Sequence, residues 1–249
     1  MQAQRRIVMS PAILYWGTPV VLITSQNEDG TNNIAPISSA WWLGHSCMLG
    51  LGADSKTTQN ILRTGECVLN LPDESMVGNV NKLANTTGSN PVSQSKLSRD
   101  YSYVKDKWTH GNLSPCQSDL VNPDCVAECP VQMECQLVQS NPLWGDLPDR
   151  RGLALAIEVR VLRVHVLENL RMPGHPNRVD PDQWRPLIMS FREFYGLGNG
   201  KVAESELGRI SEEKYRGFTK SDVKRLPGDD DDKLAAAEYS QASRILHAK

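Results

Sequence analysis

A short polar run in the chain has the composition of an anion-binding site. Asp54-Ser55-Lys56-Thr57-Thr58 follows an apolar segment and opens a predicted helix. The first N–H groups of a helix have no partner within it, and the helix dipole adds partial positive charge there. Hydroxyl groups and a lysine beside these N–H groups favour a bound phosphate. We predict that Thr57 caps the helix and donates to a phosphate, with Ser55 adding a donor and Lys56 a charge.

The alternative for this run is an ordinary helix start that binds nothing. Serine or threonine provides the cap of many helices. A lysine in the first turn also opposes the helix dipole, so an alternative place for the Lys56 ammonium is the solvent.

Small hydroxyl residues also gather at the end of a predicted strand. Residues 33–40 include Ala35-Pro36-Ile37-Ser38-Ser39, in which the proline withholds one donor from the ladder. Together with the helix start, this pattern suggests a phosphate held at one end and a flat polar ring lying along Ser38 and Ser39. The alternative is a plain strand.

The elements that must position these residues are strands joined by tight turns. Val20 to Thr24 is apolar and β-branched, and Glu28-Asp29-Gly30 is a turn signal in which glycine supplies the positive φ. Further strands are predicted at residues 47–51 and 65–71, with the helix from residue 54 between them. This order places the candidate anion site where a strand passes into a helix.

A second helix and a long connection follow. Residues 75–84 carry apolar side chains at helical spacing, namely Met76, Val80 and Leu83. Residues 88–125 are rich in Ser, Pro, Asn and Lys and show little periodicity. We expect them to run over the surface as a lid, a substrate loop or a partner contact.

The two best long strands come next, at residues 126–140 and 153–168. In the second, the apolar side chains change face after Val161, which predicts a β-bulge there. Long strands with few helices favour a closed antiparallel barrel. Residues 172–184 form a predicted proline-rich loop, and a short strand at 187–191 leads to a glycine-rich turn at 193–200.

Five short pieces of the chain stand in a characteristic order and spacing. They are Pro19-Val20-Val21-Leu22-Ile23-Thr24, Asp29-Gly30, Asn33-x-Ala35-Pro36-x-Ser38, Thr57-x-x-Asn60-Ile61 and Gly65-Glu66-x-Val68-x-Asn70. As an ordered set they resemble the flavin reductase-like, FMN-binding split β-barrel family. The match continues more weakly at residues 126–137, 152–166 and 185–188.

This resemblance implies a mainly β fold, a split β-barrel that binds FMN, with a few short helices and a charged C-terminal extension. It implies NAD(P)H-dependent reduction of FMN or FAD by hydride transfer, after which the reduced flavin passes to a partner monooxygenase or another acceptor. In relatives the nicotinamide stacks directly on the flavin, which fits the absence of a G-x-G-x-x-G motif after a strand. A homodimer is implied as well, because relatives place the flavin near the subunit boundary.

The resemblance also assigns cofactor-binding residues. They are Asn33, Ala35, Pro36, Ser38, Ser39, Ala40, Ser55, Lys56, Thr57 and Asn60. Asn33, Ala35, Ser38 and Ser39 are expected along the flavin ring. Ser55, Lys56 and Thr57 are expected around its phosphate, and Asn60 is expected to tie the helix to the loop that holds the phosphate. No residue is assigned to catalysis, because a flavin carries the hydride on its own ring while the protein binds, orients and excludes water.

Two other functions stay open beside flavin reduction. One is a flavoprotein with a fixed FMN that acts on another small-molecule substrate, and the other is a flavin-binding sensor or carrier without turnover. The same barrel serves pyridoxamine-phosphate oxidases, but Ala35-Pro36 and Thr57-x-x-Asn60 look more like the reductase branch. Gly44-His45-Ser46 stands where many relatives carry paired prolines. We therefore expect a different loop there, with substrate contact by His45 as an alternative.

Composition agrees with a globular enzyme and excludes several classes. Of 249 residues, 39% are hydrophobic and 22% are charged, which supports a core rather than general disorder. A formal net charge of −2 gives no basic footprint for nucleic acid. No apolar run reaches the roughly 20 residues of a membrane helix, and residues 1–10 lack the apolar segment of a secretion signal. We expect a cytoplasmic protein with neither nucleic-acid nor membrane partners.

Six cysteines invite a metal or disulfide interpretation. Cys125-x3-Cys129-x5-Cys135 lacks the paired CxxC spacing of zinc sites. Cys129 and Cys135 are also predicted on one strand, about 20 Å apart. We expect buried, reduced thiols and no metal. The five histidines show no metal spacing either, and His165 is expected to be a surface or satisfied residue of a strand.

The chain is divided into three parts. Residues 1–200 are the predicted flavin reductase-like domain, residues 201–228 a charged helical extension with Leu207 and Ile210 as anchors, and residues 229–249 a tag or tail. Asp229 to Asp232 followed by lysine resembles a protease-site tag, with a solvated acidic linker as the alternative. Deletion from Asp229 onward is expected to leave activity unchanged.

Overall fold

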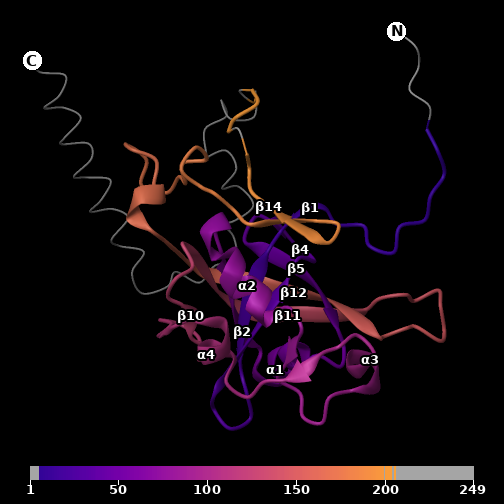
Figure 1. Ribbon diagram of the computed structural model, residues 1–249. Helices are drawn as coiled ribbons and strands as arrows, with labels where there is room; N and C mark the ends of the chain where they lie inside the picture. Colours follow the sequence, from indigo (N-terminus) through magenta and orange to yellow (C-terminus); the bar gives the residue numbers. More distant parts are fainter. Residues whose placement is uncertain (1–5, 199, 204, 206–249) are drawn as a thin grey trace, which may run out of the picture.

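The structure is a computed structural model that describes residues 6–198, 200–203 and 205 (Figure 1). In this part of the chain the largest sheet is antiparallel, with strands in the order β3-β2-β6-β11-β12-β5-β4. Its strands are β2 (Val21–Gln26), β3 (Asn32–Ile37), β4 (Ala40–Leu43), β5 (Ser46–Gly52), β6 (Glu66–Leu71), β11 (Val131–Pro142) and β12 (Ala154–Val166).

The two edge strands of this sheet, β3 and β4, lie close together because they are consecutive in the chain. Only Ser38 and Ser39 separate β3 from β4, although five strands lie between them in the sheet order. So short a link cannot cross a flat sheet, and the sheet therefore curls into a barrel. The predicted mainly β split barrel is confirmed.

Two apolar clusters lie on the two faces of β2. Val21 and Ile23 belong to the cluster shared with β5, β6, β11 and β12. Leu22, together with Val20 just before the strand, belongs to a second cluster with Ile34 and residues of the helices and the loops outside the sheet. Burial on both faces explains why this strand is a continuous apolar run rather than an alternating one.

Short elements surround the barrel. The helices are α1 (Lys56–Thr64), η1 (Glu74–Met76), α2 (Val77–Leu83), α3 (Gln94–Leu97), α4 (Lys107–Gly111) and η2 (Glu168–Leu170). The remaining strands are β1 (Trp16–Pro19), β7 (Thr86–Thr87), β8 (Ser102–Tyr103), β9 (Pro115–Cys116), β10 (Cys125–Val126), β13 (Ile188–Ser190) and β14 (Glu193–Tyr195). Of these strands, β1, β13 and β14 form a separate small sheet.

Several local predictions are confirmed. The helix predicted at residues 75–84 is η1 and α2, and its apolar residues Met76, Val80 and Leu83 are buried. Strands β11 and β12 form the long hairpin that projects from the barrel in Figure 1. Their register passes from Glu134 opposite Arg163 to Cys135 opposite Val161, so one residue is extra at the predicted bulge.

Residues 88–125 are mostly exposed, as expected of a surface excursion, and they also contain α3, α4, β8, β9 and the start of β10. Two other local predictions are wrong. Cys129 lies in a turn between β10 and β11, not on the strand of Cys135. Residues 193–195 form β14, pairing with β13, where a glycine-rich turn was expected. All six cysteines are free thiols, of which Cys116 is exposed and the others are buried.

Most of the predicted helical extension, with Leu207 and Ile210, and all of the predicted tail lie outside the described residues. Within the described ones, no helix combines the length and the apolar character needed to cross a membrane.

Candidate functional site

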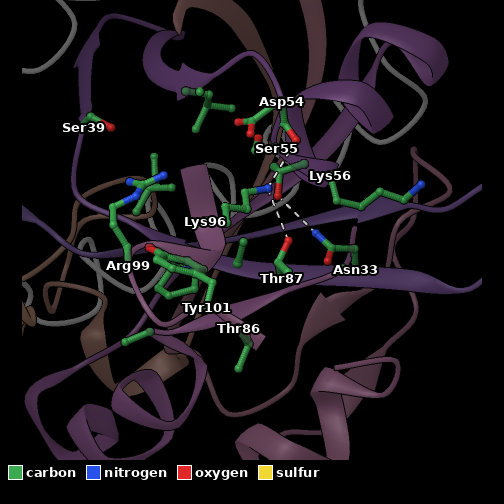
Figure 2. A pocket seen from close by; sticks show the side chains of 18 of the residues that line it. Asn33, Ser39, Asp54, Ser55, Lys56, Thr86, Thr87, Lys96, Arg99 and Tyr101 are labelled. Atoms are coloured by element: carbon green, nitrogen blue, oxygen red, sulfur yellow. Dashed lines mark hydrogen bonds between the residues drawn. The ribbon is translucent and has the colours of Figure 1, made fainter. Parts of the chain in front are cut away.

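A cavity of about 280 Å³ opens where the β3–β4 link, the start of α1 and residues 84–107 meet (Figure 2). All predicted site residues except Ala40 and Asn60 line it. The wall also includes residues that sequence reasoning did not single out, among them Tyr15, Thr86, Thr87, Gly88, Lys96, Arg99, Tyr101 and Lys107. The two groups of hydroxyl residues that the sequence placed on different elements thus face one space.

The cap of α1 is Ser55, and the prediction of Thr57 as the cap is wrong. Ser55 has an extended backbone, with φ −75° and ψ 143°, and its hydroxyl accepts a hydrogen bond from the Thr58 N–H at 3.1 Å. Thr57 lies inside the first turn and is buried. Its hydroxyl therefore does not cap the helix and instead faces the neighbouring strand β3.

Asn33 on β3 fixes the Thr57 hydroxyl. Its Nδ2 donates to Thr57 Oγ1 at 3.1 Å, so the hydroxyl proton of Thr57 remains available to a ligand. The Oδ1 atom of Asn33 is buried and has no hydrogen-bond partner. Gly88 makes room for this amide, since a Cβ at that position would lie 2.5 Å from Asn33 Oδ1.

Lys56 and Asn60 are directed elsewhere. The Lys56 ammonium forms an ion pair with Glu28, and in Figure 2 its side chain extends away from Asn33, Thr87 and Lys96. This hydrogen bond holds the pKa of Glu28 below its ordinary value. Asn60 donates to Ser25 Oγ at 3.2 Å and to Asn27 Oδ1 at 2.9 Å, which ties α1 to the end of β2 and the following turn.

Residues of β3 and of the β3–β4 link contribute one wall of the cavity, and β3 is an end strand of the sheet. Along this edge the Asn32 carbonyl accepts from Trp108 Nε1 at 3.0 Å, and the Ile34 carbonyl accepts from Lys107 Nζ at 3.0 Å. Alternate residues of a strand present their backbone groups to the same side, so the Pro36 carbonyl also faces this edge. Beyond it, Ser38 is buried and Ser39 donates to the Gly50 carbonyl at 2.5 Å.

Three cations on the wall come from the segment predicted as a surface excursion. Lys96 donates to the Asp54 carbonyl at 3.2 Å and to Thr87 Oγ1 at 3.3 Å, and Lys107 reaches β3 as described. Burial lowers the pKa of Lys107 to about 8, with the charge of Lys96 adding to the effect, and burial also lowers the pKa of Lys96. Arg99 lies over the Tyr101 ring, 5.4 Å from its centroid. No sequence pattern distinguishes these lysines from solvated ones, because only the fold buries them.

His45 and the two tryptophans of β4 lie outside the cavity wall. His45 is in the exposed turn between β4 and β5. Trp42 packs against the barrel core, whereas its neighbour Trp41 is 58% exposed on β4. These adjacent tryptophans point to opposite faces of the strand, as successive strand residues do.

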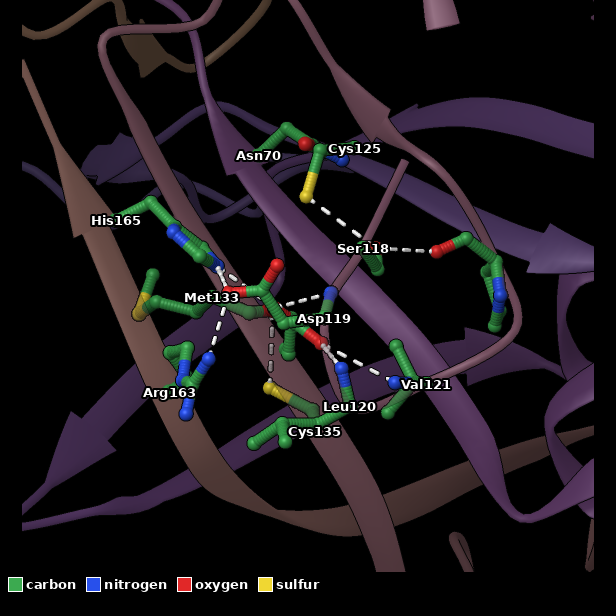
Figure 3. Close-up of polar contacts among 12 residues, drawn as sticks. Asn70, Ser118, Asp119, Leu120, Val121, Cys125, Met133, Cys135, Arg163 and His165 are labelled. Carbon is green, nitrogen blue, oxygen red and sulfur yellow. Dashed lines mark hydrogen bonds and ion pairs between the residues drawn. The ribbon is translucent and has the colours of Figure 1, made fainter. Parts of the chain in front are cut away.

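A second polar cluster lies on the outer side of β11 (Figure 3). The carboxylate of Glu134 is fully buried and accepts the backbone N–H groups of Asp119, Leu120 and Val121 at 3.1, 2.5 and 3.1 Å. His165 Nε2 donates to it at 2.6 Å. Burial alone would raise the pKa of Glu134, but His165 and the amide donors outweigh it and hold the pKa below its ordinary value.

The cluster of Asp119, Glu134 and His165 brings together groups that could ligate a metal ion. Each Glu134 oxygen, however, already accepts two N–H donors, which uses the acceptor capacity of the carboxylate. Asp119 is further engaged by Arg163 at 2.6 Å. These hydrogen bonds and the ion pair therefore hold the loop at residues 117–124 against the sheet. His165 is satisfied, as expected.

Comparison with known proteins gives a consistent picture. A family model described as a flavin reductase like domain matches residues 15–198. The uncharacterized protein YdfE of Bacillus subtilis (strain 168) is 36% identical over 200 residues, which are 80% of this chain and 93% of that protein.

Solved structures share the fold. Flavoredoxin of Desulfovibrio vulgaris (Miyazaki F) superposes with a TM-score of 0.65 at 18% identity, covering 83% of this chain and 100% of that one. Nitrilotriacetate monooxygenase component B from Bacillus cereus has a TM-score of 0.61 at 23% identity, covering 78% and 90%.

Proposed function

The chain belongs to the flavin reductase-like family of flavin-related oxidoreductases, and we propose that it uses NADH or NADPH to reduce FMN or FAD by hydride transfer. The observation that carries this proposal is the cavity beside the β3–β4 link. It joins a groove of backbone and hydroxyl groups to an end that holds buried cations and a helix start.

The residues around this cavity suit a flavin. The unpartnered Asn33 Oδ1, the available Thr57 hydroxyl proton and the two buried lysines leave polar capacity that the protein itself does not use. Ser55, Thr57 and the first N–H groups of α1 are the proposed contacts of the flavin phosphate. Ala35, Pro36, Ser38 and Ser39 are the proposed contacts of the flavin ring.

Three residues of the expected set have revised roles in this proposal. Lys56 contributes its aliphatic stem to the wall while its charge stays with Glu28. Asn60 supports α1 through its hydrogen bonds to the β2 end. Ala40 does not line the cavity, and its side chain is part of the barrel core.

A bound flavin supplies a ring that accepts a hydride from the nicotinamide and passes electrons on. The task of this chain is then to hold the ring against β3, to neutralise the phosphate and to exclude water from the buried end. No protein acid or base is required on the cavity wall for this chemistry. The partly exposed side near Ser39 and Tyr101 leaves room for the donor and acceptor to enter.

Two assembly features belong to the proposal. We infer a homodimer, since exposed apolar side chains lie on the edge strand β4 and on β1. Transfer of reduced flavin to a partner monooxygenase is the proposed use of the product. A protein of the same fold carries the name of a monooxygenase component, which is compatible with such a partner.

The proposal is tested by the visible absorption spectrum of the protein with FMN or FAD, followed by anaerobic addition of NADH or NADPH. Bleaching of the flavin band, faster than in a protein-free control, is expected and identifies the donor. A band that stays oxidised with both donors would contradict the reductase and favour a flavin carrier. Absence of bound flavin under all conditions would remove the flavin site.

A second measurement separates free-flavin reduction from a fixed prosthetic group. With excess FMN and excess donor, a reductase consumes many equivalents of donor per protein under anaerobic conditions. A protein with fixed FMN consumes one equivalent and stops unless another substrate is present.

A further inference from the structure

The short strands β9 and β10 place two cysteines opposite each other. Cys116 on β9 is the register partner of Cys125 on β10, and the two strands are antiparallel. Residues directly opposite in such a pair have Cα atoms about 4.5–5.5 Å apart and side chains on the same face. A disulfide bond needs Cα atoms roughly 4.4–6.8 Å apart. The backbone therefore already holds these two free thiols at the spacing of a disulfide.

Solvent reaches one member of this pair. Cys116 is exposed, whereas Cys125 is only 2% exposed. Cys67 on β6 and Cys135 on β11 are also directly opposite, but both lie in the barrel core, where neither side chain is exposed. Of the opposite cysteine pairs in the described part of the chain, the β9–β10 pair is therefore the one that a dissolved oxidant can meet.

The thiol of Cys125 is positioned by Ser118, which belongs to the loop between the two strands (Figure 3). The Ser118 hydroxyl donates to the Pro123 carbonyl at 2.6 Å, so in its contact with Cys125 Sγ at 3.4 Å the thiol is the donor. Burial raises the pKa of Cys125, and this thiol therefore stays protonated at neutral pH. Oxidation thus begins at the exposed Cys116, and Cys125 reacts second.

We propose that Cys116 and Cys125 form a reversible disulfide when the protein meets a peroxide. The Cys116 sulfur attacks one oxygen of hydrogen peroxide, the O–O bond breaks, and a sulfenic acid and one water are formed. The Cys125 sulfur then attacks the Cys116 sulfur, the S–O bond breaks, and the leaving hydroxide takes the Cys125 proton as a second water. The two thiols thus give two electrons to one peroxide, and a dithiol reductant reverses the reaction.

This disulfide joins the two ends of the loop at residues 117–124. Asp124 ties the loop to the barrel, because its carboxylate accepts from Asn32 on β3 at 2.7 Å and its carbonyl accepts from Thr24 on β2 at 2.6 Å. Neither cysteine lines the cavity, so the modification needs no bound flavin and does not rest on the proposed function.

The test is to treat the reduced, full-length chain with hydrogen peroxide after removal of the reductant, and then to count thiols and map peptides. We expect the number of thiols titrated in the denatured protein to fall by two, and dithiothreitol to restore them. Cleavage at aspartate and glutamate separates the cysteines from Cys116 to Cys135, because acidic residues stand between each successive two, namely Asp119, Asp124, Glu128 and Glu134. Mass spectrometry of the non-reduced peptides is expected to show Cys116 linked to Cys125.

Variants assign the two roles. Cys116→Ser changes an exposed side chain and is expected to lose no thiol to peroxide. Cys125→Ala is expected to form no disulfide and to keep a sulfenic acid on Cys116, which dimedone traps. Cys129→Ala removes the next buried thiol along the chain and is the matched control, which should form the disulfide as the wild type does.

Three outcomes would overturn the proposal. They are an unchanged thiol count in the wild type, a disulfide between Cys67 and Cys135, and a covalent dimer through Cys116 in place of the internal link. Mapping of the wild type needs no variant, so the proposal stays testable even where Cys125→Ala impairs folding. A protein that forms the disulfide but binds no flavin would overturn the proposed function alone.

Discussion

Thr57 is the side chain whose role changes most between sequence and structure. It does not cap α1, and its oxygen accepts from Asn33 Nδ2 at 3.1 Å. The amide thus orients the hydroxyl so that its proton is the part left for a ligand. A residue that resembles a common helix cap becomes a candidate ligand contact only because β3 brings an amide beside it.

We predict that Thr57→Val weakens flavin binding by about 1–2 kcal/mol, the value of a hydrogen bond to a charged group, with little loss of fold. A flavin titration measures the affinity, and thermal unfolding monitors the fold. Thr31→Val, at the exposed β2–β3 turn, is the matched control and should bind flavin normally. Unchanged affinity in Thr57→Val would place the phosphate elsewhere.

Lys107 gives the site a predicted pH dependence. Burial, aided by the charge of Lys96, lowers the pKa of Lys107 from 10.5 to about 8. Below this pH the ammonium is charged and attracts a phosphate, whereas above it the amine is neutral. FMN affinity should therefore fall as pH rises through about 8, while riboflavin affinity stays level. Parallel pH profiles for the two flavins would refute this prediction.

The same pKa fixes the sign of the effect of Lys107 on stability. Between about 8 and 10.5 the unfolded chain holds a proton that the folded chain has released. The contribution of this group to the free energy of unfolding therefore rises with pH in that window.

Among the elements, the loop at residues 117–124 is ordered by side chains rather than by its own backbone. Glu134 accepts three consecutive N–H groups of the loop, and Glu66 accepts both the N–H and the Nδ2 of Asn122. Asp124 adds contacts to Thr24 and Asn32 at the base of β3. The loop thus supports a strand that contributes one wall of the cavity.

We predict that Glu134→Gln lowers the free energy of unfolding by about 2–4 kcal/mol, because an amide cannot accept all four donors and buries a donor without a partner. The pKa of Glu134 lies below its ordinary value, so its stabilisation is lost as pH falls through that folded-state pKa. The variant should therefore show a flatter acid limb of stability.

Chemical denaturation at several pH values measures this effect. Glu168→Gln is a suitable control, since the side chain of Glu168 is 89% exposed. Equal acid limbs in wild type and Glu134→Gln would show that another group governs the stability at low pH.

For the whole molecule, the exposed apolar side chains near β4 suggest which surface of the barrel associates with a second molecule. Trp16, Trp41 and Leu43 are 68%, 58% and 76% exposed, and β1 packs against β4. An edge strand with exposed large apolar residues is normally covered by another chain or element. A second copy of this chain is the proposed cover.

We predict that Trp41→Asp together with Leu43→Asp converts a homodimer into a monomer, because the charges oppose burial of this edge. Light scattering coupled to size-exclusion chromatography measures the mass. Leu97→Asp, an exposed residue on α3, is the control and should leave the dimer intact. A monomeric wild-type protein, or a dimeric double variant, would rule out β4 as the interface.

The sequence by itself determined the elements whose pattern is local. The apolar runs of β2, β6, β11 and β12, the helix at residues 75–84 and the bulge beside Val161 all follow from the period of neighbouring residues. The ordered motifs identified the family, and the hydroxyl residues around 38–39 and 55–57 identified two walls of the cavity.

Only the tertiary structure decided which polar groups complete the site. Lys96 and Lys107 are ordinary lysines in a segment without periodicity until the fold buries them beside β3. Lys56 is drawn to Glu28, and Thr57 is held by Asn33 rather than by its own helix. These outcomes depend on contacts between residues far apart in the chain. Local patterns report the period of an element but carry no record of which distant side chain will lie against it.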